Sequence, residues 1–303
     1  MPSGTPTNRT NIELPSEVSS VILQKAQDQS AIMQLATRMN LPGWGLTIPV
    51  ITSDPEAEWV SETGAKPVKN PGLSKKVMQA YKLAVIVPFS EEFRRDAASL
   101  YNALVNRLPL ALAKKFDETV IHGSAPGSNF DVLGSCTAQD IGAAPYASLV
   151  AAMDDIADAG GVMNGFVISP KAKSTLLLAL DLNQRPIFLD SVAQGSVPMI
   201  LGCPTHLTKA AYKAAAGANP AVVGVAGDWT QALYGIAQGM KVSISDQATL
   251  TLADSSTINL WQNNMFAVRA EIEVGFRADT DCFDLLTQTV SGATGATGAT
   301  GNT

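Results

Sequence analysis

Apolar residues recur every three or four positions from Phe93 to Val120, and this spacing predicts a long amphipathic helix with one continuous apolar stripe. Ser90 is suited to cap its N-terminus, because the hydroxyl can accept a hydrogen bond from a free amide of the first turn. Pro109 interrupts the stripe and is expected to bend the helix or break it locally, and Gly123 is expected to end it. The stripe consists of Phe93, Ala97, Leu100, Leu104, Leu108, Leu112, Phe116 and Val120.

Strands are predicted on both sides of this helix in the sequence. Thr47–Ile51 has the composition of a strand, and Met240–Ser245 and Met265–Phe276 alternate between apolar and polar residues. In the last segment the even-numbered residues from 266 to 274 are apolar and share one face, whereas Arg269 and Glu271 share the other. The simplest interpretation of Glu271 is an exposed carboxylate that balances the charge of Arg269.

The middle of the chain alternates between helical and strand patterns. Ala147–Ala159 and Lys171–Leu180 have helical spacing, whereas Gly165–Ser169 and Ala221–Ala226 are apolar runs typical of buried strands. Alternation of this kind predicts an α/β core. Two further short strands are predicted at Ile187–Asp190 and Met199–Leu201.

A polar, proline-interrupted excursion at residues 53 to 76 separates two strand-like hydrophobic runs, Trp44–Ile51 and Val77–Val87. Three glutamates lie in its first half and four lysines in its second, so two antiparallel legs would carry opposite charges, which stabilises a hairpin modestly. Its central stretch, Trp59–Pro67, suggests an arm that projects towards a neighbouring molecule. The alternative interpretation is a solvated surface loop, although loops of this length in compact domains are usually functional or disordered.

Both ends of the sequence have the composition of flexible segments. Residues 1 to about 14 are rich in Thr, Pro, Ser and Asn, and Ser16 then offers a cap for a short N-terminal helix. The last residues, Ser291–Thr303, repeat Gly-Ala-Thr. Glycine at every third position is typical of collagen, but this run is short and lacks proline, so a flexible tail is the better prediction.

Composition predicts a folded, acidic protein. The chain has 303 residues, of which 46% are apolar and 16% charged, and its net charge is −6. Such a surface does not attract nucleic acid as a whole, although a shell that merely contains DNA can be acidic. Met1–Glu13 is polar and no run of about 18 apolar residues occurs, so we expect neither a secretory signal nor a membrane span, and synthesis in the cytosol.

Catalytic, cofactor and metal chemistry find little support in the sequence. The three cysteines and two histidines are isolated, whereas a metal site needs clustered ligands. No phosphate-binding glycine motif, nucleophile elbow or zinc-protease motif occurs. Asp154 and Asp155 are adjacent on a predicted helix and point about 100° apart, so they would not face one substrate together. We therefore predict no cofactor, no metal and no enzymatic turnover.

The order of these parts resembles the major capsid protein of tailed bacteriophages, with its Hong Kong ninety-seven-type fold. The resemblance spans roughly residues 15 to 288 and is carried by Trp59–Pro67, by Pro88-Phe89-Ser90 and by Asn264–Phe276. It implies an α+β capsid fold with a long spine helix. The implied parts are an N-terminal arm (1–45), an extended β-hairpin loop (46–86), a peripheral domain (87–140), an α/β axial domain (141–239), return strands of the peripheral domain (240–290) and a flexible tail (291–303).

This resemblance also implies a function and partners. The chain is expected to assemble with copies of itself as hexamers and pentamers into an icosahedral shell around double-stranded DNA, in the host cytoplasm, without a membrane. Portal and scaffolding proteins are implied partners, and a decoration protein is a further one. Two alternatives stay open: an encapsulin-like nanocompartment, which packages a cargo enzyme instead of DNA, and an enzyme with an unrecognised site.

Some members of the family join their subunits by isopeptide bonds, and the resemblance implies candidates for that chemistry. Lys66 corresponds to the reactive lysine, Asn264 to the asparagine on a neighbouring subunit, and Glu271 to the glutamate that accepts a proton. A lysine must attack as the neutral amine, which desolvation favours, and a carboxylate in apolar surroundings can take the proton. The alternatives are that Lys66 forms a salt bridge to a neighbouring carboxylate and that Asn264 caps a loop.

Overall fold

The chain divides into two compact units in a computed structural model that describes residues 30–43, 45–53, 57–60, 66, 68–70, 72–96, 98–180, 199–252 and 254–289. The first unit comprises residues 1–120, 124–132 and 232–278, and the second comprises 121–123, 133–231 and 279–303. The predicted N-terminal helix, the strand at Ile187–Asp190 and the C-terminal tail lie outside the described residues.

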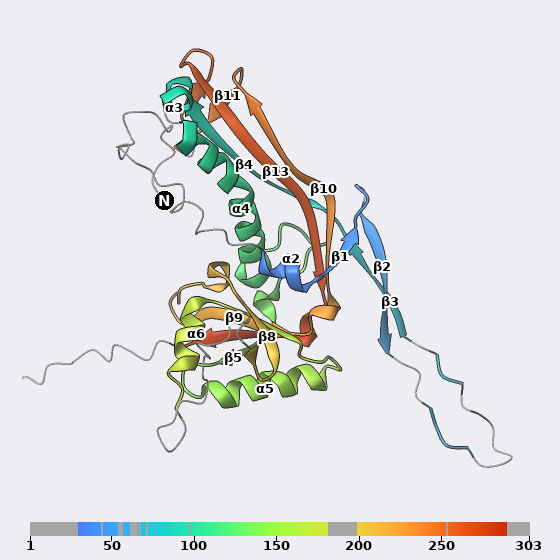
Figure 1. Ribbon diagram of the computed structural model, residues 1–303. Helices are drawn as coiled ribbons and strands as arrows, with labels where there is room; N and C mark the ends of the chain where they lie inside the picture. Colours follow the sequence, from blue (N-terminus) through green and yellow to red (C-terminus); the bar gives the residue numbers. More distant parts are fainter. Residues whose placement is uncertain are drawn as a thin grey trace, which may run out of the picture. The chain divides into compact units, whose positions relative to one another are not determined.

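A four-stranded sheet forms the framework of the first unit, in the order β1-β10-β13-β4 (Figure 1). The long strand β13 (Met265–Ala278) pairs antiparallel with β10 (Ala232–Ser245) on one side and with β4 (Tyr81–Ser90) on the other. The short strand β1 (Thr37–Asn40) pairs parallel with the beginning of β10. The strand predicted at Met265–Phe276 is therefore confirmed as the centre of a sheet.

Two helices cover one face of this sheet: α3 (Glu91–Asp96) and α4 (Ala98–His122). The predicted apolar stripe is confirmed from Leu100 to Leu112, where its side chains share one core with the even-numbered residues 266 to 272 of β13, whereas Ala97 lies outside the described residues. The Ser90 hydroxyl accepts a hydrogen bond from the Phe93 amide at 3.2 Å, as a cap should. The shared core contains Phe89, Phe93, Leu108, Leu112, Phe266, Val268, Ala270 and Ile272, with Leu100 and Leu104 packed against it.

The break expected at Pro109 is absent, because α4 runs through this residue and ends at His122, just before Gly123. A proline removes one hydrogen bond from the helical ladder. The stripe on both sides of Pro109 is anchored in the core, with Leu108 8% and Leu112 3% exposed. Burial of the flanking turns therefore holds the helix together across the proline.

A buried carboxylate joins α4 to the start of the described chain. Asp117, 1% exposed, accepts hydrogen bonds from the Ser30 hydroxyl at 2.5 Å and from the Ala31 amide at 3.0 Å. The Ala31 amide is a free donor at the N-terminus of the short helix α2 (Ala31–Leu35), where a negative charge is favourable, and Ser30 is the cap of this helix. The short helix α2 is thus tied to α4 through a buried carboxylate.

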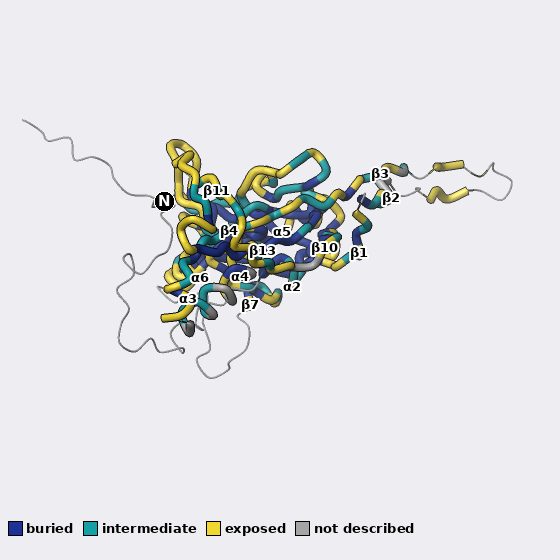
Figure 2. The backbone as a smooth tube through the Cα atoms, turned by 90° about the horizontal axis from the view of Figure 1, so that it is seen from above, coloured by how far each residue is buried: buried dark blue, intermediate teal, exposed yellow. Residues whose placement is uncertain are grey.

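Two antiparallel hairpins complete the first unit. The hairpin β2–β3 joins Leu46–Ser53 to Gly72–Met78, and the smaller hairpin β11–β12 joins Thr249–Thr251 to Thr257–Asn259. Figure 2 shows that the sheet and helices enclose buried residues, whereas the described segments beyond β2–β3 are exposed. The strand predicted at Thr47–Ile51 is confirmed.

The second unit is built on a six-stranded mixed sheet in the order β5-β14-β9-β6-β8-β7. The helices α5 (Pro145–Asp158) and α6 (Pro170–Leu177) join its core, so the alternating pattern correctly predicted an α/β unit. The strands are β5 (Thr137–Asp140), β6 (Gly165–Ile168), β7 (Met199–Ile200), β8 (Cys203–Leu207), β9 (Ala221–Gly227) and β14 (Phe283–Gln288). Short 3₁₀ turns lie at Leu133–Ser135, Lys209–Ala211, Trp229–Gln231 and Thr280–Cys282.

The strand pairing departs from the expected segment boundaries in three places. β10 begins at Ala232, so it crosses the boundary expected at residue 239, and β4 pairs with β13 on both sides of the boundary expected at residue 86. β14 pairs with β9 and belongs to the second unit, although residues 240–290 were expected to form one return segment. Glycines at 235 and 239 and a glutamine at 238 obscure the alternation along β10. The names axial and peripheral stay predictions.

Candidate functional site

The β2–β3 hairpin and the segment beyond it form the candidate functional site. Its strands pair from Leu46 opposite Met78 to Ser53 opposite Gly72, with one irregularity near the outer end. A two-stranded hairpin without other support is at best marginally stable in water. The hairpin therefore depends for its stability on the contacts that its base makes with the rest of the first unit.

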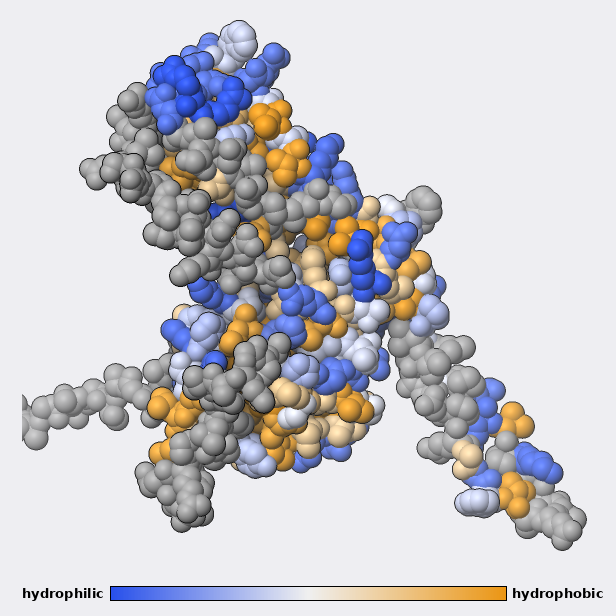
Figure 3. All heavy atoms as spheres, viewed as in Figure 1, coloured by the Kyte–Doolittle hydropathy of each residue, from blue (hydrophilic) through white to orange (hydrophobic). Residues whose placement is uncertain are grey.

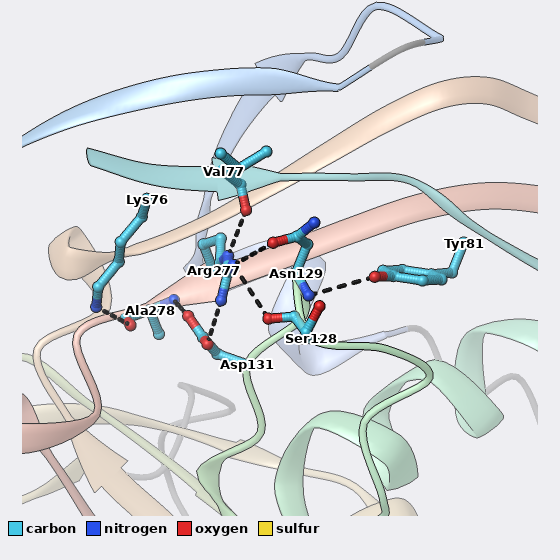
Figure 4. A network of polar contacts seen from close by, with 8 residues as sticks. All are labelled: Lys76, Val77, Tyr81, Ser128, Asn129, Asp131, Arg277 and Ala278. Atoms are coloured by element: carbon cyan, nitrogen blue, oxygen red, sulfur yellow. Dashed lines mark hydrogen bonds and ion pairs between the residues drawn. The ribbon is translucent and has the colours of Figure 1, made fainter.

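Arg277, at the end of β13, fixes the base of the hairpin with a cluster of polar contacts (Figure 4). Its guanidinium donates to the Val77 carbonyl at 2.8 Å and to Asp131 Oδ1 at 2.6 Å. The Asp131 Oδ2 atom in turn accepts from the Ala278 amide at 3.2 Å. The side chains of Arg277 and Asp131 are only 12% and 20% exposed, so loss of either partner would leave a largely buried charge unpaired.

Further contacts surround this pair. Arg277 Nη2 also donates to Asn129 Oδ1 at 3.2 Å and to the Ser128 carbonyl at 3.3 Å. Lys76 Nζ donates to the Ala278 carbonyl at 3.1 Å, and the Asn129 amide donates to the Tyr81 hydroxyl at 3.3 Å. No local motif in the sequence distinguishes Arg277 or Asp131. The only available signal was an arginine near the end of an otherwise buried strand.

The described residues beyond the hairpin expose apolar side chains next to charged ones (Figure 3). Trp59 is fully exposed, at 105%, and Val68 is 90% exposed. Lys69 Nζ lies 3.0 Å from Glu58 Oε1, which confirms that opposite charges face each other on the two legs. Both partners are about half exposed, so this pair contributes at most about 1 kcal/mol. Lys66 is exposed, and its neighbours 61–65 and 67 lie outside the described residues.

Asn264 occupies a turn that requires unusual backbone geometry. Its φ is +53°, in the left-handed region that asparagine tolerates better than most residues. Its carbonyl accepts a hydrogen bond from the Glu91 amide at 3.1 Å, so it joins the start of β13 to the start of α3. The loop role that the sequence left open for Asn264 is thus present. Its side chain is exposed beside the charged residues of α3, in an open depression lined by Glu91, Glu92, Arg94 and Arg95.

Glu271 lies in the middle of β13 and is more enclosed than its sequence context suggested. It is only 8% exposed, so the expectation of an exposed carboxylate is wrong. The expected partner is correct, because Arg269 Nε lies 3.5 Å from Glu271 Oε2. Strands pair on both sides of Glu271, with Lys241 of β10 and Ala84 of β4 opposite it.

Asn264 and Glu271 are not neighbours within one subunit. Glu271 is the seventh residue of β13, and Asn264 directly precedes that strand. At about 3.4 Å per residue their backbones are separated by roughly 24 Å. Direct proton transfer needs heavy atoms about 3 Å apart. A cross-link that uses both residues therefore requires Glu271 from a different subunit than the one that supplies Asn264.

Other chemistry would need clustered metal ligands, a membrane-spanning helix or a reactive thiol among the described residues. They contain no group of three or more His, Cys, Asp or Glu side chains placed to hold a metal ion. No described helix is long and apolar enough to cross a membrane. The three cysteines are free thiols, and burial raises the pKa of Cys136 to about 12, an effect that the nearby charges of Asp284 and Asp281 reinforce. A thiol held in its protonated form is a poor nucleophile.

Solved structures share this arrangement over nearly the whole chain. A chain of Gordonia phage Cozz matches with a TM-score of 0.73 at 21% identity, over 91% of this chain and 92% of that one. A chain of Mycobacterium phage Adephagia also matches with a TM-score of 0.73 at 21% identity, over 95% and 100%. The capsid of the native GTA particle computed with C5 symmetry matches with a TM-score of 0.65 at 18% identity, over 92% and 95%. The architecture is the α+β fold of phage capsid proteins.

Sequence comparison assigns the family. The chain belongs to the phage capsid family, whose profile matches residues 11–279. It is 28% identical to the probable major capsid protein gp17 of Mycobacterium phage D29 over 288 residues, covering 88% of this chain and 87% of that protein. The corresponding protein of Mycobacterium phage L5 is also 28% identical, over 87% of this chain and 85% of that protein. The chain is thus a structural major capsid protein, not an enzyme, and the nanocompartment alternative is not favoured.

Proposed function

We propose that this chain assembles as hexamers and pentamers into an icosahedral shell that encloses double-stranded DNA. The observation that carries the proposal is the extended hairpin, whose described outer residues include a fully exposed tryptophan. Exposed aromatic side chains are enriched where proteins meet partners. A second copy of the chain is the partner that a capsid protein always has available.

Other features support the same proposal. A structural relative is described as a capsid computed with C5 symmetry, which fits five-fold capsomers. The net charge of −6 suits a container that holds DNA without gripping each phosphate. DNA must enter the shell through an opening, so a portal protein is a proposed partner. Subunits must be guided while the shell closes, so a scaffolding protein is a second proposed partner, and assembly is proposed to take place in the host cytoplasm. A decoration protein on the outer face is a further proposed partner.

Expression of the full-length chain tests the proposal. We expect sedimentation as capsomers or particles and closed shells with five- and six-fold clusters in electron micrographs. Trp59→Ala should reduce particle yield at least tenfold if the tryptophan is an interface anchor worth about 1.4 kcal/mol or more. Tyr146→Ala is the matched control, since Tyr146 is also an exposed aromatic residue, at 48%, but belongs to α5 of the second unit. Sedimentation of the wild type only as a 31.7 kDa monomer would contradict the proposal.

We further propose that Lys66 of one subunit joins Asn264 of another, with Glu271 supplied by a subunit other than the one that holds Asn264. The neutral Nζ of Lys66 attacks Cγ of Asn264 and forms a C–N bond. The bond from Cγ to Nδ2 breaks, and the proton lost by Lys66 passes through the Glu271 carboxylate to the departing nitrogen, which leaves as ammonia. The exposure of Lys66 and of Asn264 supports this proposal, because both side chains are accessible to another subunit.

Boiling mature particles in detergent tests the cross-link. We expect a ladder of bands above the 31.7 kDa monomer and, by mass spectrometry, a peptide joining the two residues with loss of one ammonia. Lys66→Arg should abolish the ladder, because a guanidinium is not a nucleophile near neutral pH. Lys69→Arg is the matched control on the same leg of the hairpin and should leave it intact. A single monomer band from mature wild-type particles would refute the cross-link and leave the shell proposal standing.

A further inference from the structure

Two opposed glycines of the sheet leave room for Met78 at the base of the hairpin, and this space is called the socket. Gly235 of β10 and Gly275 of β13 lie directly opposite each other, and Met78, which is fully buried, packs against both. A Cβ atom at Gly235 would lie 3.0 Å from Met78 Sδ. A Cβ atom at Gly275 would lie 3.0 Å from Met78 Cγ and 2.6 Å from the Gln79 carbonyl oxygen. Any side chain at position 275 would therefore push the hairpin junction away from the sheet.

The other strand of the hairpin is held at the same point. Gly45, directly before β2, has a φ of +94°, which favours glycine. A Cβ atom there would lie 2.8 Å from the Met78 carbonyl oxygen. Gly45 thus lets the first leg of the hairpin approach Met78, the residue seated on Gly235 and Gly275, more closely than a residue with a side chain could.

The polar cluster around Arg277 holds Val77, the residue directly before Met78. Arg277 is two residues after Gly275 on β13, and it bonds the Val77 carbonyl, while Gly275 makes room for Met78. The apolar socket opposes translation of the junction, and the two hydrogen bonds from the guanidinium, one to the Val77 carbonyl and one to Asp131, oppose its rotation. Neither element alone constrains both motions.

We propose that the socket and the hydrogen bonds of Arg277 together form a positioning lock, which sets the direction in which the hairpin leaves the sheet. This direction determines which surface of a second copy the tip of the hairpin meets. Lys66 precedes Met78 by twelve residues, so it lies at most about 40 Å from the lock. A rotation of about 10° at the base would move the tip by up to about 7 Å. An interface contact or a reacting pair tolerates far less than that. The role of the lock in assembly rests on the proposed shell function. Its mechanical part, the restraint of the hairpin by the sheet within one subunit, does not depend on that function.

Amide hydrogen exchange on the full-length chain, kept below its assembly concentration, tests the mechanical part. Arg277→Lys retains the charge but loses the fork, and Asp131→Asn removes the acceptor charge. In both variants exchange within Gly72–Met78 should accelerate about tenfold to a hundredfold, the range expected for lost charged hydrogen bonds. Exchange in α4 should stay within about twofold of the wild type. Gly275→Ala should give the same acceleration, and Arg277→Lys keeps the test decisive if the alanine variant fails to fold.

Lys82→Gln is the matched control, because it removes an exposed ion pair with Glu273, 3.1 Å long, on the same sheet. Unchanged hairpin exchange in both Arg277→Lys and Asp131→Asn would overturn the lock, whether or not shells form. Accelerated exchange together with normal shells and yield would overturn its role in assembly and leave the shell proposal intact. Accelerated exchange with aberrant or absent particles, while wild type and Lys82→Gln form closed shells, is the expected result.

Discussion

Asp284 provides a test of the energetics of the second unit. This β14 carboxylate is 1% exposed, and its Oδ2 atom has no hydrogen-bond partner among the described residues. Burial, reinforced by the nearby charge of Asp155, raises the pKa of Asp284 to about 6 from its ordinary value of 3.8. A hydrogen bond between the side chains of Gln139 and Asp284 lowers the pKa and partly opposes this shift. The raised pKa means that the folded chain prefers the protonated carboxyl.

The sign of the pH dependence follows from that preference. In the unfolded chain Asp284 loses its proton near pH 4, whereas the folded chain keeps it until about pH 6. Stability contributed by the protonated group is therefore present below pH 4 and lost as the pH rises through about 6. Above pH 6 the buried charge costs roughly 3 kcal/mol. Asp284→Asn removes that cost, so it should stabilise the second unit at pH 7.5 by up to this amount and have little effect at pH 4.

Native-state amide exchange in β14 and β9, corrected for intrinsic rates, is the appropriate assay because it reports the second unit alone. We expect Asp284→Asn to slow exchange there by up to about a hundredfold at pH 7.5. Asp158→Asn, on the exposed face of α5, is the matched control and should change little. Faster amide exchange in Asp284→Asn than in the wild type at pH 7.5 would refute the reasoning. A slowing of exchange that is equal at pH 4 and pH 7.5 would refute it as well.

Three further predictions concern the first unit. Leu112→Ala in α4 should lower the unfolding free energy by about 2–5 kcal/mol, because Leu112 is 3% exposed in the core, and chemical denaturation will measure it; a loss below 1 kcal/mol would contradict the packing. Lys69→Ala breaks the exposed pair with Glu58 and should cost less than about 1 kcal/mol in the same assay; a larger loss would show that the pair is shielded. Trp59→Ala should leave the unassembled chain as stable as wild type while reducing assembly measured by light scattering; loss of both together would place Trp59 in the subunit's own fold.

Local periodicity predicted the elements that bury one continuous face. The stripe of α4 and the alternation of β13 were recognisable because each contributes a regular apolar set to one core. β14, Phe283–Gln288, was missed because it is buried on both faces and too short to show a period. The first half of β10 was missed because Gly235, which accommodates Met78, interrupts the pattern there. In that case the residue that hides the strand is the one that positions the hairpin.

The candidate site was predictable only in part. A charged hairpin was inferred from the opposed glutamates and lysines, and the Glu58–Lys69 pair confirms that inference. The contact between Arg277 and Asp131 could not be inferred, because 146 positions separate the two residues and neither belongs to a local motif. The distance between Asn264 and Glu271, in contrast, follows from the strand predicted at Met265–Phe276, because an extended chain separates residues seven positions apart by about 24 Å.

A cryo-electron microscopy map of the particle formed by the wild-type chain tests the shell proposal most directly. We predict a closed icosahedral shell in which the hairpin of each subunit lies on a neighbouring subunit, with Trp59 buried in that contact. The same map shows whether density joins Lys66 of one subunit to Asn264 of another. Hairpins that contact no neighbour and leave Trp59 in solvent, or a chain that forms no particle at all, would contradict the proposal.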